Sequence, residues 1–201
     1  MSVLLVIANN NGGLNELYVS MRQNASEFRD QNPAGDPVHS FSRIDMLSTF
    51  ARLAGDAGPG WIVPAGMVFV LLTGGGLWHR ISNAGQSWIG ETNSGIPCVA
   101  ILLCIYHQPH DMLLLVPFMV CLWNDVKKPD RQPVDALVFG LLATVFANFA
   151  ATATILNRIG GTSSPLWVPA TSINGLILLV VFAILCAKAA QMITHDRASA
   201  E

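Results

Sequence analysis

Residues 96–123 read IPCVAILLCIYHQPHDMLLLVPFMVCLW, two apolar runs separated by the polar segment 107–111. Pro109 lacks a backbone N–H and clashes with the preceding turn, so it interrupts any continuous helix here. Ionisable side chains near a bilayer are costly and mark functional sites by default. This break holds three of them, His107, His110 and Asp111. We therefore expect the chain to cross a membrane, turn at this segment and cross back.

The composition supports a membrane location. The chain has 201 residues, of which 52% are hydrophobic and 12% are charged, whereas a soluble domain carries about 25% charged residues. Residues 57–79, 136–157 and 159–187 contain no Asp, Glu, Lys or Arg. About 20 apolar residues in a helix cross the hydrocarbon core. The sequence therefore predicts an all-α, polytopic transmembrane bundle.

The pattern predicts about five full spans and a partial helix at residues 1–8, followed by an outer-face loop at 9–60 and the transmembrane bundle at 61–201. The expected spans are 61–78, 96–106, 112–123, 136–156 and 172–193. The first eight residues are too short for a span, and we expect them to be the tail of a helix whose beginning is missing. A short interfacial segment is the alternative. Truncation would make the chain the C-terminal part of a longer protein.

The outer-face loop contains a predicted amphipathic helix at residues 40–54. Its apolar face carries Met46, Leu47, Phe50, Leu53 and Ala54, and its polar face carries Asp45, Ser48, Thr49 and Arg52. Such a helix suits the membrane interface or a groove over the bundle.

Charge and cysteine usage exclude other classes of partner. The net charge of −2 gives no indication of nucleic-acid binding. The four cysteines lie in apolar runs without CxxC spacing, so we expect neither a metal site nor disulfides. In this topology one face carries Arg80, the cluster from Lys127 to Arg131, and Lys188. We assign this face to the cytoplasmic side of a multi-pass cell-membrane protein. Four arginines in residues 9–60 oppose this orientation.

Two segments resemble glycosyltransferase family 87, a group of integral membrane enzymes of the GT-C type. They are HQPHDMLLLVPFMVCLW at residues 107–123 and FSRIDML at residues 41–47. The resemblance implies an enzyme that moves a sugar, typically mannose, from a polyprenyl-phosphate donor to an outer-face acceptor, without a cofactor. Relatives of this type carry a catalytic Asp in an early outer loop, and no such loop exists here. The chain would then be a C-terminal half, either inactive alone or completed by a separate chain.

Five residues are candidates for substrate binding under this resemblance: His107, His110, Asp111, Arg43 and Asp45. Inverting sugar transfer needs a carboxylate near the acceptor hydroxyl, and the phosphate leaving group needs cations or hydrogen-bond donors. The structural alternatives are that Asp111 caps a helix, that His107 sits at headgroup level, and that Arg43 and Asp45 flank each other on a solvated face.

Two further classes of function stay open at this point. Polar residues within spans and glycine runs suit a transporter module, although charges deep within the spans are nearly absent. The unusual start of the chain also suits a non-catalytic membrane subunit or a remnant.

Overall fold

The computed structural model describes residues 43–54, 61–83, 94–105, 109–129, 132–147 and 152–200, with the single positions 16, 19, 23, 38 and 39. Every regular element in these ranges is a helix, which confirms the all-α prediction. The predicted partial helix at residues 1–8 and most of the predicted loop at residues 9–60 lie outside the described residues.

The elements follow one another in the order α3 (Met46–Ala54), α4 (Ile62–Asn83), α5 (Gly95–Cys104), η4 (Pro109–Leu115), α6 (Val116–Val126), α7 (Pro133–Ala147), α8 (Ala153–Arg158), η6 (Gly161–Ser163) and α9 (Trp167–Ala200). The elements η4 and η6 are 3-10 helices.

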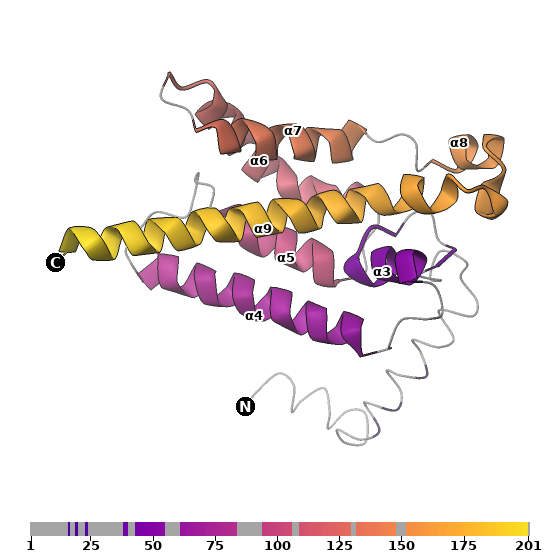
Figure 1. Cartoon of the computed structure of the whole chain (residues 1–201), viewed down its shortest axis with the longest axis horizontal. Coiled ribbons are helices and arrows are strands. Elements are labelled where there is room, and N and C mark those ends of the chain that lie inside the picture. The colour runs from indigo at the N-terminus through magenta and orange to yellow at the C-terminus, as the bar shows by residue number, and fades with distance from the viewer. Residues whose placement is uncertain are drawn as a thin grey trace.

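The long helix α9 is the centre of the packing, and it runs the length of the molecule in Figure 1. Helices α3, α4, α5 and α7 pack against it, while α6 packs against α7. The core side chains of α9 recur at helical spacing, at Leu178, Val181, Phe182, Leu185 and Ala189, all buried. Helices α3 and α8 lie near its N-terminal end, and the turn between α6 and α7 lies toward its C-terminal end.

The structure has an interruption between helices close to the break predicted after residue 106. Helix α5 ends at Cys104, and Ile105 is extended with φ −107° and ψ 140°. The chain then forms η4, a tighter 3-10 helix, from which α6 continues. Pro109 at the start of η4 has no N–H to offer a preceding turn. The chain therefore changes helix type at the segment that the sequence singled out.

One expected helix is divided in the structure. The sequence predicted an uninterrupted helix over residues 136–156, but α7 ends at Ala147 and α8 begins at Ala153. Thr152 before α8 is extended, with φ −85° and ψ 145°. Thr152 is β-branched, and such residues lose rotamer freedom in a helix. The prediction of a continuous helix relied on the lack of charged residues in this stretch, and that feature does not distinguish a continuous helix from a divided one.

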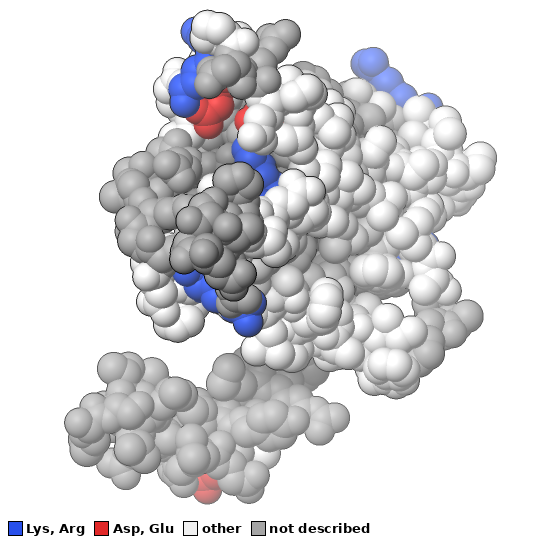
Figure 2. Space-filling view, turned by 60° about the vertical axis from the view of Figure 1, so that its left-hand side comes forward, with Lys and Arg blue, Asp and Glu red and all other residues white. Residues whose placement is uncertain are grey.

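Two helices are long and apolar enough to cross a membrane, judged by length and composition. These are the 22 residues Ile62–Asn83 and the 28 residues Trp167–Thr194 within α9. The apolar helices α5 and α7 are shorter. Large apolar side chains are exposed on α4, including Phe69 at 68% and Leu72 at 70% of their surface. Figure 2 shows a face whose described surface is mostly uncharged.

Helix α3 is amphipathic, as predicted, but its polar face points into the protein. Ser48 and Thr49 are fully buried, whereas Leu53 on the opposite face is 49% exposed. Helix α3 also begins at Met46, six residues later than the predicted start at residue 40. Polar groups can be buried in this way because they are hydrogen-bonded within the protein.

A partly buried ion pair joins α7 to α9 at the end of the molecule opposite α3. The Lys188 ammonium lies 2.5 Å from Asp135 Oδ1, with side-chain exposures of 16% and 8%. Asp135 is in the first turn of α7, where a carboxylate also interacts favourably with the helix dipole. A lone lysine inside an apolar helix indicates a partner, and this partner is Asp135.

We predict that Asp135→Asn lowers the free energy of unfolding by about 3 kcal/mol, since it removes the carboxylate charge that faces a largely buried ammonium. Asp135→Lys combined with Lys188→Asp should restore part of this loss. Asp125→Asn is the matched control because it breaks the exposed pair with Lys128. Thermal unfolding in nanodiscs measures all of these variants, and equal effects at the two aspartates would contradict the prediction.

Candidate functional site

A buried cluster of polar side chains lies where the start of α3 meets the start of α9. Its first part is a bidentate ion pair between two predicted site residues. Arg43 Nε donates to Asp45 Oδ2 at 2.8 Å, and Arg43 Nη2 donates to Asp45 Oδ1 at 3.0 Å. Arg43 is 7% exposed and Asp45 is 1% exposed. The predicted pairing is present, but the expectation of a solvated face is wrong, because α3 presents its polar face to the bundle.

Asp45 also caps α3. Its Oδ1 accepts the Ser48 backbone N–H at 2.9 Å, which satisfies one of the unpaired donors at the helix start. Its backbone carbonyl accepts the Ser48 and Thr49 hydroxyls at 2.9 and 3.0 Å. The Asp45 carboxylate thus neutralises Arg43 and caps the start of α3. Asp45, which was predicted to bind substrate, therefore has a structural role.

Arg52 connects α3 to two other parts of the chain. Its Nη1 donates to the Thr171 carbonyl of α9 at 2.6 Å, and its Nη2 donates to the Arg43 carbonyl at 2.8 Å. Sequence reasoning placed Arg52 on the polar face of its helix without giving it a partner. The contact spans 119 positions in the chain, so no local pattern could have identified it.

A glycine allows the two helices to approach this closely. A methyl group on Gly175 of α9 would overlap Thr49 Oγ1, and would lie 3.0 Å from Thr49 Cβ and 3.1 Å from the Ile44 carbonyl oxygen. Backbone atoms cannot move aside as a flexible side chain can. Gly175 is therefore needed for α3 to reach α9, as small residues are at many helix contacts within membranes.

The remaining predicted site residues lie in or beside η4. Asp111 is exposed in the first turn of this 3-10 helix. His107 lies outside the described residues, and so does the side chain of His110. Element η4 packs against α5 and α6, whereas α3 packs against α9, α4 and α5. The structure therefore brings Arg43 together with Asp45 and gives Asp111 a separate, accessible position.

The opposite end of the molecule holds contacts that the sequence did not predict. Lys127 Nζ lies 4.6 Å from the centroid of the Trp123 ring, within cation–π range. Lys128 Nζ lies 2.6 Å from Asp125 Oδ1. The ring of Trp123 also lies 5.3 Å from that of Phe139 on α7. The spacing of Trp123 and Lys127, four positions apart on a helix, was the available signal.

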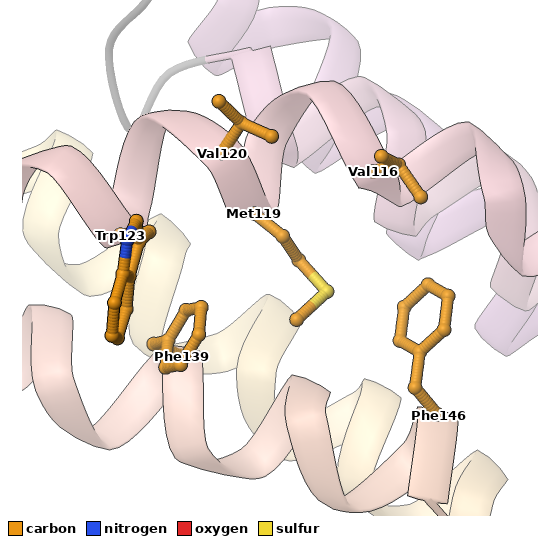
Figure 3. A pocket seen from close by; sticks show the side chains of 6 residues that line it. All are labelled: Val116, Met119, Val120, Trp123, Phe139 and Phe146. Atoms are coloured by element: carbon orange, nitrogen blue, oxygen red, sulfur yellow. The ribbon is translucent and has the colours of Figure 1, made fainter.

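Trp123 is one of six side chains that line an apolar groove between α6 and α7. The groove has a volume of about 400 Å³, and its lining residues are Val116, Met119, Val120, Trp123, Phe139 and Phe146. Figure 3 shows the α6 side chains and the two phenylalanines of α7 along this groove. No group of three potential metal ligands occurs in the described part of the chain, and all four cysteines are free thiols.

We predict that Gly175→Ala separates α3 from α9, because the new methyl group meets Thr49 and the Ile44 carbonyl. The amides of α3 should exchange hydrogen at least tenfold faster, while those of α6 keep their rates. Gly140→Ala is the matched control, since a methyl group there meets no atom within 4 Å. Hydrogen-exchange mass spectrometry measures both variants, and unchanged α3 rates in Gly175→Ala would rule out the close contact.

No protein-family model matches the chain, and no curated protein or solved structure matches it either. The similarity to glycosyltransferase family 87 therefore rests on the two short segments quoted above.

Proposed function

We propose that the chain is a multi-pass protein of the cell membrane and that about five of its segments cross the bilayer. Exposed apolar surface supports this proposal. Phe69 and Leu72 of α4 are about two-thirds exposed, and little of either long apolar helix is buried within the protein. The core helix of a soluble protein would be mostly buried, and large exposed apolar patches are costly in water.

The placement of polar contacts along α9 supports the same proposal. Its partners bind it through charged side chains at Thr171 and at Lys188. These positions are about 25 Å apart along the axis at 1.5 Å per residue, close to the thickness of a hydrocarbon core of about 30 Å. Between them, α9 packs mostly through apolar side chains, and its buried polar residues Ser172 and Asn174 lie close to Thr171. The shorter α5 and α7 would cross together with flanking residues.

The proposed topology predicts that the turns before and after α7 lie on opposite sides of the membrane. In a variant without native cysteines, we expect Lys128→Cys and Ser163→Cys to react with a membrane-impermeant maleimide from opposite sides of sealed vesicles. Both positions are exposed, so both should react after detergent is added. Labelling of both from one side would show that α7 does not cross.

We further propose that the chain is the C-terminal part of a membrane glycosyltransferase that uses a polyprenyl-phosphate sugar donor. The observation that carries this proposal is the exposed carboxylate of Asp111, located at a break between two apolar helices in the segment that resembles family 87. A carboxylate there can accept a proton from an acceptor hydroxyl or bind sugar hydroxyls. His107 and His110 would supply hydrogen-bond donors to the phosphate.

Arg43 and Asp45 have a supporting part in this proposal. They bind each other and are buried, so they position α3 beside the outer end of α9 and would meet phosphate only if α3 moved. A phosphate would compete for the guanidinium with a bidentate carboxylate, which is already a strong partner.

In the intact enzyme, Asp111→Asn should lower sugar transfer by about 100-fold if the carboxylate acts as a base, within the range for positioned acid–base groups. Asp125→Asn at the opposite end is the matched control and should leave transfer unchanged. The assay measures transfer from a polyprenyl-phosphate sugar, with membrane abundance determined for each variant. Normal sugar transfer by Asp111→Asn would contradict a role of the Asp111 carboxylate in the reaction.

A non-catalytic membrane subunit is the second candidate, and one observation favours it. Two of the five proposed site residues are satisfied by each other inside the protein. If the chain is a subunit of this kind, Asp111→Asn should leave sugar transfer unchanged. Gly175→Ala, which alters the docking of α3, should reduce it.

A further inference from the structure

We infer that the groove between α6 and α7 binds one acyl chain of an anionic phospholipid, whose phosphate is held by Lys127. This inference rests on the membrane placement proposed above and not on the enzymatic proposal. The groove lies at the α6–α7 side of the bundle, and Lys127 follows α6 at the end that holds Asp135 and Lys188.

The lining of the groove suits a hydrocarbon chain. All six side chains are apolar, and none offers a hydrogen bond that a peptide backbone would need, apart from the indole N–H of Trp123. From Val116 to Trp123 the groove follows α6 for about 10 Å at 1.5 Å per residue. A second helix of that length, about 10 Å across, would occupy roughly 800 Å³, twice the groove volume of about 400 Å³. A flexible acyl chain fits, whereas a helix would remain largely outside.

The charge at the mouth of the groove selects the headgroup. The Lys127 ammonium lies 4.6 Å above the ring of Trp123, which itself lines the groove. Lys128 is bound to Asp125 at 2.6 Å, so this pair carries no net charge. Lys127 therefore leaves one positive charge among the described residues at this mouth. A phosphate can bind the outward N–H groups of the ammonium while the ring contacts its inner side.

The opposite end of the groove would not hold an anionic headgroup as well. Val116 there follows Asp111 by between one and two turns of the 3-10 helix η4, and Asp111 is exposed. A carboxylate repels phosphate. The inferred lipid is thus oriented with its phosphate at the lysine end, which is the face assigned to the cytoplasm. The cytoplasmic leaflet is also where anionic lipids attract basic residues.

Quenching of tryptophan fluorescence by brominated lipids tests the inference. The protein is placed in two sets of nanodiscs with the same proportions of phosphatidylglycerol and phosphatidylcholine. Bromine is carried on the chains of one lipid or of the other, so the headgroup composition is constant. The contribution of Trp123 is the difference between the native chain and Trp123→Phe, which keeps a ring in the groove.

We expect Trp123 to select phosphatidylglycerol over phosphatidylcholine about fivefold, as one lysine at an anionic surface allows. Lys127→Gln should abolish this selectivity. Lys128→Gln is the matched control, because it removes an equal charge from the adjacent residue, and it should retain most of the selectivity. Equal quenching of Trp123 by the two lipids, or selectivity that persists in Lys127→Gln, would overturn the inference.

The other tryptophans separate this result from a failure of the membrane placement. In Trp123→Phe, they should be quenched by both brominated lipids if the chain is inserted. Absence of this quenching would overturn the membrane placement and the lipid site together. Its presence without selectivity at Trp123 would overturn the lipid site alone.

Discussion

Helix α9 is one long apolar segment against which four other helices pack, and among its described side chains the contacts with charged groups are at Thr171 and Lys188. At Thr171 the partner is Arg52, and at Lys188 it is Asp135. Between these points most contacts are between apolar side chains, which give attraction without fixing a register, and the close contact of Gly175 with Thr49 lies near Thr171. The two polar contacts therefore set how far α3 and α7 lie along α9. The positions of η4 and of the α6–α7 groove follow from that arrangement.

The inward polar face of α3 shows where sequence reasoning reached its limit. Periodicity identified the two faces correctly, because it depends only on the angle between successive residues. The side that is buried depends on what the helix packs against, and α3 packs against the start of α9. There Ser48 and Thr49 donate to the Asp45 carbonyl, and Arg52 donates to the carbonyls of Thr171 and Arg43. A surface helix of a globular protein usually buries its apolar face instead.

The predictable part of the fold was the part with long apolar sequence. Both long helices were expected, as was the change of conformation around Pro109, because length and proline stereochemistry act locally. The break between α7 and α8 was missed because the segment carries no charge, and its Asn and Thr residues alter helix stability only slightly. The pair Asp135–Lys188 and the close contact at Gly175 were also missed. Each joins residues far apart in the chain, and neither has a local signature.

The candidate site was predictable in composition but not in arrangement. Arg43 and Asp45 were singled out for their chemistry, and the structure places them in one ion pair that begins α3. Asp111 was singled out for its position, and it is the accessible carboxylate of the described candidates. Burial separates the two cases: the Asp45 carboxylate already binds the Arg43 guanidinium and the Ser48 backbone N–H, so it has little capacity left for a substrate. Asp111 is exposed at a break between apolar helices, so solvent reaches its carboxylate. Exposure therefore distinguishes the two carboxylates, and residue type and spacing alone did not show which of them is buried.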